Sequence, residues 1–197
     1  RAACTPWRYF FRPDPSLAPG SATPEKDIIT NLVMQINACQ NGAEIVSSGK
    51  NAGVFKAGGA GSRPETVADF YRIEDYEGYI WLAHNRYATA SPGKWERPDP
   101  FNLHDWSVVE NGKITTYGTN RRYIESFGYT CSNSTDSEVI TCLIDLLVRR
   151  HGLDIDLAIR ALAPPYWDEI DLMPESKQKL NRALRFAYGP ATMNGPF

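Results

Sequence analysis

The sequence predicts an α+β fold in which strands gather in the first part of the chain and helices follow them. Short runs rich in β-branched and aromatic residues occur between residues 43 and 118, and helical periodicity dominates from residue 120 onward. Strands and helices do not alternate regularly, which disfavours a parallel sheet built from βαβ units. With 197 residues, 42% of them hydrophobic, the chain is long enough to bury a core as one domain.

The first elements expected are an extended strap and a helix. Residues 1–23 are rich in proline and form the strap, so the main domain is expected over residues 24–197. The next apolar positions recur at intervals of three and four, and they are Ile28, Ile29, Leu32, Val33 and Ile36. This spacing predicts an amphipathic helix that begins with Thr23 as its cap and Pro24 in its first turn.

Most strands are expected between this helix and residue 118. AEIVSSG at 43–49 and GVFKAGG at 53–59 predict a hairpin, and PETVADFYRI at 64–73 predicts a short helix. GYIWLAHNRY at 78–87 is apolar on both faces, which predicts a central strand. WSVVE and KITTY flank Asn111-Gly112, a pair typical of a type I′ turn, so a second hairpin is expected there.

Helices are expected over the rest of the chain. NRRYIESFG at 120–128 predicts a short helix closed by Gly128, and LDIDLAIRAL and PESKQKLNRALRFAY predict two later helices. Before these two, residues 135–151 predict a further helix, in which Thr135 and Glu138 would form a capping box. Its apolar positions are Val139, Ile140, Leu143, Leu146 and Leu147.

Composition and charge exclude several classes of function. A net charge of −2 without a block of like charges gives no basis for binding nucleic acid or an anionic membrane. No apolar run approaches the roughly 20 residues that span a bilayer, so a soluble, cytoplasmic protein is expected. The chain has no C-x-x-C pair, metal-ligand histidine spacing or G-x-S-x-G motif, so neither a metal nor a serine nucleophile is assigned. The cysteines, expected to be reduced thiols, are Cys4, Cys39, Cys131 and Cys142.

Three places along the chain could serve a ligand, although each also has a structural interpretation. Arg86 ends an apolar run, where its guanidinium could hold a carboxylate by two bonds or form a surface ion pair. Asn111-Gly112 could belong to a site or only to the expected turn. Asp136 stands in the first turn of a helix, where the helix dipole favours it whether or not it binds a ligand.

The order of these motifs is more specific than any one of them. HNRYAT is followed by PF, then by NG at 111–112 and by TDSEVI at 135–140. In this order the chain resembles the class II glutamine amidotransferases, which are N-terminal-nucleophile hydrolases that release ammonia from glutamine. The finer resemblance is to the glutaminase component of archaeal-type glutamate synthase. It is carried by PWRYFFRPDP, SSGKNAGVFKAGG, PFNLHDWSVV, YGTNRRYIESFGY and ALAPPYWDEID.

This resemblance implies a fold and a role for five residues. Arg86, helped by Thr89, would bind the glutamine α-carboxylate, and Asp136 would pair with the α-ammonium. The Asn111 side chain and the Gly112 backbone N–H would form the oxyanion hole for the tetrahedral intermediate. The implied fold is a four-layer αββα sandwich, with two antiparallel sheets between helices. No cofactor is expected in this chain, whereas FMN and an iron–sulfur cluster are expected on the synthase partner that receives the ammonia.

The nucleophile of that family is a cysteine at the mature N-terminus, whose own α-amine acts as the base. Cys4 fits this role poorly, because residues 1–3 precede it and Pro6 cannot donate a hydrogen bond within the first strand. We therefore expect an incomplete part of the sandwich that lacks the nucleophile strand and the C-terminal part. The nucleophile would come from a separate chain after cleavage or from residues outside this sequence.

Two substitutions distinguish this chain from the family, which has HNGEI where this chain has ENGKI. Glu110 replaces a histidine and Lys113 replaces a glutamate, so a carboxylate stands beside the expected oxyanion hole. The first hypothesis is a glutaminase domain that supplies ammonia to a glutamate synthase-like partner. The alternatives are a non-catalytic amidotransferase-like binding or assembly subunit and an N-methylglutamate synthase-like amidotransferase subunit.

Overall fold

The computed structural model describes residues 7–39, 42–57, 63–85 and 99–195, and within these ranges helices are combined with one short sheet. The helices are α1 (Pro24–Cys39), α2 (Pro64–Tyr71), α3 (Tyr117–Glu125), α4 (Asp136–Ile144), α5 (Ile155–Leu162), α6 (Trp167–Asp171) and α7 (Glu175–Tyr188). The sheet pairs β1 (Phe101–Leu103) with β2 (Trp106–Val108) in antiparallel fashion. Shorter helical segments are η1 (Pro15–Leu17), η3 (Ile73–Asp75), η4 (Asp145–Arg150) and η5 (Gly189–Ala191). This composition is compatible with the predicted α+β class.

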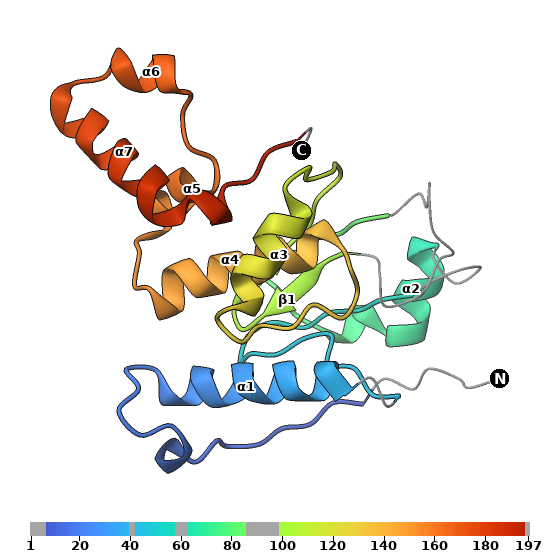
Figure 1. The fold of residues 1–197 in the computed structure, drawn as a ribbon. Coiled ribbons are helices and arrows are strands. Elements are labelled where there is room, and N and C mark those ends of the chain that lie inside the picture. Colours follow the sequence, from blue (N-terminus) through green and yellow to red (C-terminus); the bar gives the residue numbers. More distant parts are fainter. Residues whose placement is uncertain (1–6, 40–41, 58–62, 86–98, 196–197) are drawn as a thin grey trace.

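The elements are arranged around the small sheet (Figure 1). α1 lies on one side of β1, and α3 and α4 lie on the other side. α4 packs against α3 and against both strands. α5, α6 and α7 form an arm that projects from this body, and within it α7 packs against both α5 and α6. The four-layer sandwich and the boundary at residue 23 stay predictions.

The core is centred on α4, because this helix is enclosed on nearly all sides. Every residue of 137–143 is buried. The side chains of Leu143 in α4 and of Leu146 and Leu147 in the π-helical η4 that continues it are fully buried. A helix enclosed all round has its position fixed by packing. The first residue of α4, Asp136, is therefore held in place by the core of this chain.

The helices predicted from apolar periodicity are confirmed. α1 begins at Pro24, and the Asp27 N–H donates to the Thr23 carbonyl. α2, α5 and α7 occupy their predicted segments, and Gly128 after α3 has a φ of 86°. α6 and the π-helical form of η4 were not predicted. Across the described residues, no helix combines the length and apolar character needed to cross a membrane.

The first predicted hairpin is wrong, because residues 42–57 contain no strand. Asn37 of α1 binds both backbone groups of Ile45, since its Oδ1 accepts the N–H at 2.8 Å and its Nδ2 donates to the carbonyl at 3.2 Å. Asn102 Oδ1 accepts the Ser48 N–H at 2.9 Å. Side-chain amides from α1 and β1 thus satisfy backbone groups that would otherwise have paired in a hairpin.

The second predicted hairpin is also wrong. β2 pairs with β1 rather than with residues 113–117, and the turn between the paired strands contains His104 at a φ of 54°. Neither Asn111 nor Gly112 has the positive φ that a type I′ turn requires. The Asn-Gly pair therefore lies in a segment after β2 that is not a type I′ turn. The interpretation of this pair as only a hairpin turn, the alternative to a functional site, is wrong.

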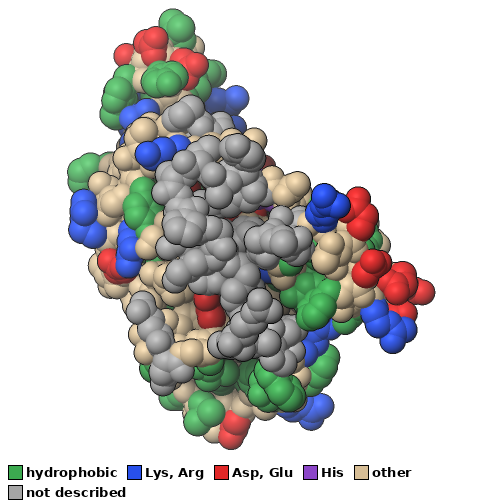
Figure 2. Space-filling model, turned by 90° about the vertical axis from the view of Figure 1, so that its right-hand side faces the viewer, with side chains coloured by type: hydrophobic (Ala, Val, Ile, Leu, Met, Phe, Trp, Pro, Cys, Tyr) green, Lys and Arg blue, Asp and Glu red, His purple; other side chains and the backbone are tan. Residues whose placement is uncertain are grey.

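The predicted central strand at 78–87 is wrong over the residues that the structure describes. Residues 78–85 carry no strand, and the side chains of Tyr79 and Ile80 are 93% and 74% exposed. A central strand requires a hydrogen-bonded neighbour on each side, and the two-stranded sheet of the described ranges does not include this segment. Figure 2 shows that hydrophobic side chains also reach the surface at several separate places on one face of the molecule.

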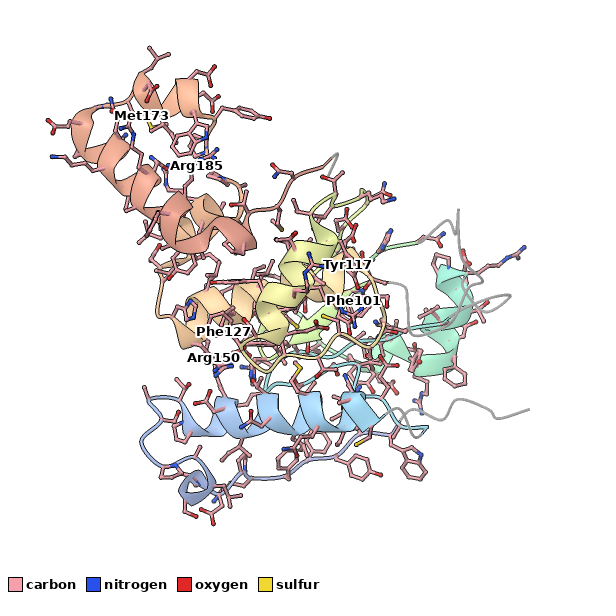
Figure 3. All side chains as sticks on the ribbon, viewed as in Figure 1. Phe101, Tyr117, Phe127, Arg150, Met173 and Arg185 are labelled. Atoms are coloured by element: carbon pink, nitrogen blue, oxygen red, sulfur yellow. The ribbon has the colours of Figure 1, made fainter. Side chains whose placement is uncertain are left out.

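The arm formed by α5–α7 has its own internal contacts (Figure 3). Met173 lies in the connection between α6 and α7, and the guanidinium of Arg185 in α7 stacks 4.4 Å from the centre of the Trp167 ring in α6. Asn181 Nδ2 donates to the Lys177 carbonyl at 2.8 Å. The chain that follows α7 returns to the body, where the Thr115 N–H donates to the Asn194 carbonyl at 2.7 Å.

Candidate functional site

Asp136 connects the start of α4 to the segment that carries Asn111 and Gly112. Its Oδ2 accepts the backbone N–H of Ile114 at 2.7 Å. Ile114 is buried, with 1% of its surface exposed, whereas Asn111 and Gly112 are exposed. Because α4 is fixed by the core, this hydrogen bond fixes one end of the short exposed segment. The structure thus joins Asp136 to the segment that carries Asn111 and Gly112, through a residue 22 positions earlier in the sequence.

The other end of this segment is fixed by Asp99, which the sequence reasoning missed. Asp99 Oδ2 accepts the backbone N–H of Glu110 at 2.8 Å, and Asp99 is 7% exposed. Two buried or half-buried carboxylates, Asp99 and Asp136, therefore bind the N–H groups on either side of residues 111–113. A charge-assisted hydrogen bond of this kind is about twice as strong as a neutral one. The pair holds the exposed residues 111–113 in a defined conformation.

His84 brings the segment that leads to Arg86 toward the same place. Its Nδ1 lies 3.2 Å from Asp99 Oδ2, and the two groups form an ion pair when the imidazole is protonated. The His84 side chain is 17% exposed and that of Asp99 is 5% exposed. Arg86 and Thr89 themselves lie outside the described residues, so their predicted roles stay predictions.

The surroundings of Glu110 change the pKa of its carboxyl group. Its Oε1 is buried and has no hydrogen-bond partner among the residues that the structure describes. Burial raises the pKa of the Glu110 carboxyl above its ordinary value, and the nearby charges of Asp136 and Asp99 raise it further. The Gly112 backbone N–H and His84 act in the opposite direction and lower that pKa. A carboxyl with a raised pKa at a cluster of charged groups is typical of a functional site.

The predicted capping box at the start of α4 is wrong. Thr135 is the N-cap residue but makes no side-chain capping bond, and within the described ranges its buried Oγ1 has no hydrogen-bond partner. Glu138 instead accepts the backbone N–H groups of Ser132 and Asn133 at 2.8 and 2.9 Å. Burial raises the pKa of Glu138, while these two N–H groups lower it. Glu138 thus orders the loop before α4 and leaves Asp136 to bind Ile114.

A separate small cavity lies on the other side of Glu138, between α1, β1 and α4. Its volume is about 40 Å3, and it is lined by residues that include Met34, Glu44, Phe101 and Glu138. Pockets that hold small organic ligands are usually several hundred Å3 in volume. None of the three predicted site residues that the structure describes, Asn111, Gly112 and Asp136, lines it. We therefore place the candidate site at the exposed segment beside Asp136 rather than at this cavity.

Comparisons with known proteins give partial similarity to glutamine-dependent enzymes. The chain is 36% identical over 102 residues to the glutamine–fructose-6-phosphate aminotransferase of Sulfurisphaera tokodaii, which covers 48% of the chain and 16% of that enzyme. It is 33% identical over 113 residues to the amidophosphoribosyltransferase of Methanocaldococcus jannaschii, covering 53% of the chain and 23% of that enzyme. These are partial homologies to N-terminal-nucleophile-type glutamine amidotransferases.

A longer match is to an uncharacterised protein of Archaeoglobus fulgidus, which is 46% identical over 192 residues. This match covers 97% of the chain but 50% of the relative, so the chain spans half the length of that protein. No family model matches the chain. No solved structure matches it either. The glutamate synthase resemblance is not tested by these matches and stays a prediction.

Proposed function

We propose that the chain is the glutamine-binding part of a glutaminase domain that supplies ammonia to a partner enzyme or domain. The observation that carries this proposal is the hydrogen bond from the Ile114 N–H to Asp136 Oδ2, which joins Asp136 to the segment that follows Asn111-Gly112. The partial similarity to glutamine amidotransferases supports the same reaction class. Substrate, partner and reaction steps are all part of the proposal.

In this proposal the charged ends of glutamine bind to opposite charges. Arg86, with Thr89, holds the α-carboxylate, since a guanidinium can donate two parallel hydrogen bonds to it. Asp136 attracts the α-ammonium through the half-buried carboxylate that also accepts the Ile114 N–H. The side-chain carboxamide of glutamine then reaches Asn111 and Gly112. Both residues are exposed, which supports their access to a bound substrate.

The proposed chemistry is acyl transfer through a thioester. The thiolate of an N-terminal cysteine adds to the carboxamide carbon, and the carbonyl oxygen becomes an oxyanion. The Asn111 amide and the Gly112 N–H would stabilise that charge, and one such donor is typically worth about 3–4 kcal/mol of the barrier. Collapse of the intermediate releases ammonia, and water then hydrolyses the thioester to glutamate. The cysteine's own α-amine serves as the base.

The proposed fold is the four-layer sandwich completed by further strands. This proposal is supported by residues 79–82, which form a run of four large apolar side chains that are all exposed. Contiguous exposed apolar residues of this kind usually mark a surface that another segment covers. The run leads directly to His84 and Asp99 at the candidate site.

A glutamate synthase-like partner carrying FMN and an iron–sulfur cluster is the acceptor that we propose for the ammonia. One observation favours a second candidate function, a non-catalytic amidotransferase-like module. Glu110 places a carboxyl beside the expected oxyanion hole, and an anion there opposes charge development on the substrate oxygen. The two candidates differ in a single measurable property, the release of ammonia from glutamine.

The test is an assay of ammonia from L-glutamine with the full-length protein, together with its partner where one co-purifies. Asp136→Asn should raise KM for glutamine about tenfold or more, because it removes the charge that pairs with the α-ammonium but keeps an oxygen for the Ile114 N–H. Asp171→Asn is the matched control, since Asp171 is an exposed aspartate paired with Arg182 in the arm. Absence of ammonia release would contradict the glutaminase and favour the non-catalytic module.

A further inference from the structure

A single oxygen of Asp99 contacts two separate segments of the candidate site. Asp99 Oδ2 accepts the Glu110 N–H at 2.8 Å, and the same atom lies 3.2 Å from His84 Nδ1. The side chains of Asp99 and His84 are 5% and 17% exposed, so little water competes for either contact. Because Glu110 directly precedes Asn111-Gly112, the Asp99 carboxylate holds the backbone from which the expected oxyanion hole begins.

The register of the small sheet explains why Asp99 meets Glu110. The paired strands end where Phe101 of β1 lies opposite Val108 of β2. Continued by two residues on each strand, this antiparallel register puts residue 99 opposite residue 110. At that position the Asp99 carboxylate, rather than a backbone carbonyl, accepts the Glu110 N–H. The contact therefore follows from the strand pairing and does not depend on a chance approach of two loops.

The strand that sets this register is held by α4. This helix packs against both strands of the sheet. In that contact Thr141 Oγ1 lies 3.5 Å from the carbonyl oxygen of Phe101, and both residues are buried. The same helix begins with Asp136, which accepts the Ile114 N–H. One buried helix thus holds both ends of the exposed residues 111–113, one end through β1 and the other directly.

We infer that Asp99 is a positioning residue of the candidate oxyanion hole, an inference that rests on the proposed function. Asp99 acts on the reaction only through the Glu110 N–H, by which it keeps Asn111 and Gly112 in place. Donors stabilise an oxyanion best when they already point to the place where its charge develops. Displacement of a reacting group by about 1 Å can cost about 100-fold in rate. Loss of the Asp99 anchor should therefore lower kcat, whereas KM should change little because other residues bind the charged ends of glutamine.

The first measurement compares ammonia release from L-glutamine by variants of the full-length protein. Asp99→Ala should lower kcat about 10- to 100-fold and change KM by less than about threefold. Asp99→Asn keeps an oxygen acceptor, but a neutral one binds an N–H about half as strongly, so its kcat should lie between those of Asp99→Ala and the wild type. The matched control is Asp105→Ala in the turn of the same sheet. The Asp105 side chain is 52% exposed and pairs with Lys26, so this variant should keep the wild-type kcat.

The second measurement reports the anchor independently of catalysis. It follows hydrogen exchange of the Glu110 amide by NMR in the folded variants, because the bond to Asp99 protects this N–H. Exchange at Glu110 should be about tenfold or more faster in Asp99→Ala than in the wild type, with Asp99→Asn between them. A role of Asp99 in global stability alone would instead speed exchange along the whole chain and leave the kcat of the folded enzyme unchanged.

The outcomes separate this inference from the proposed function. The inference is supported if kcat falls from wild type to Asp99→Asn to Asp99→Ala at nearly constant KM, while exchange at Glu110 accelerates in the same order. A wild-type kcat in Asp99→Ala overturns it and leaves the glutaminase standing, as does a lower kcat without faster exchange at Glu110. If Asp99→Ala does not fold, Asp99→Asn decides by the same two criteria. If the wild type releases no ammonia, the glutaminase is wrong, and the role of Asp99 is overturned with it.

Discussion

Two sides of the candidate site differ in how this chain supports them. On one side, Asp136 begins a helix whose residues 137–143 are all buried. On the other side, residues 78–85 lead to His84 with no regular structure, and Tyr79 is 93% exposed. The first side is positioned by the packing of this chain alone, whereas the second is joined to it through the His84–Asp99 contact. The comparison indicates that the α4 side is preorganised and that the 78–85 side depends on additional contacts.

The largest expected difference is in the free energy of unfolding. Leu143→Ala should lower it by about 2–5 kcal/mol, because Leu143 is fully buried in α4 and its removal leaves a cavity. Ile80→Ala should lower it by less than about 0.5 kcal/mol, because that side chain is already 74% exposed. Urea denaturation of each variant measures both values. Equal losses would contradict the proposed difference between the two sides.

A smaller effect is expected at the junction of α4 and the exposed segment. Asp136→Ala removes the acceptor of the Ile114 N–H and leaves this N–H of a buried residue unsatisfied. The loss should lower the free energy of unfolding by about 1–3 kcal/mol. Asp136→Asn keeps an oxygen acceptor and should cost less. Thermal unfolding of the pair separates the hydrogen bond from the charge. If both variants were as stable as the wild type, Asp136 would not anchor the segment.

The smallest expected effect is a dependence of the free energy of unfolding on pH, through His104. His104 is buried, and its Nε2 lies 2.7 Å from Thr30 Oγ1. Burial lowers the pKa of His104 below its ordinary value of 6.5, so the unfolded chain binds the proton more readily than the folded chain does. The neutral His104 side chain therefore contributes fully to the free energy of unfolding above pH 6.5. This contribution is lost as the pH falls below 6.5 and through the lowered pKa of His104.

His104→Gln isolates this pH effect from the other titrating groups. Glu138 has a raised pKa, so its own contribution is lost as the pH rises and has the opposite sign. The stability difference between wild type and His104→Gln should therefore shrink as the pH is lowered from 7.5 to 5.5. Urea midpoints at the two pH values measure it, and a difference that grows on acidification would mean that the pKa of His104 is raised instead.

The helices were predictable from sequence because their signal is local. Apolar residues three and four positions apart place one face toward a core, and α1, α4 and α7 formed where that spacing occurs. The strands were not predictable to the same degree. A β-rich run becomes a strand only when another strand binds its backbone, and at Ile45 the side chain of Asn37 binds it instead.

The candidate site was predictable only where its residues have a signal in the sequence itself. Asp136 was recognisable from its place at a helix start, and Asn111-Gly112 from the motif order. Asp99 was not, because an isolated aspartate before a proline gives no local sign that it will bind the Glu110 N–H eleven residues later. The capping box failed because Glu138 was expected to bind its own helix end, whereas it binds Ser132 and Asn133.

The most direct test of the central claim is the effect of Asn111→Ala on ammonia release from L-glutamine by the full-length protein. If Asn111 stabilises the oxyanion, kcat should fall about 100- to 1000-fold while KM for glutamine changes little. An unchanged kcat, or a rise in KM with kcat preserved, would contradict the assignment of Asn111 and Gly112 to the oxyanion hole.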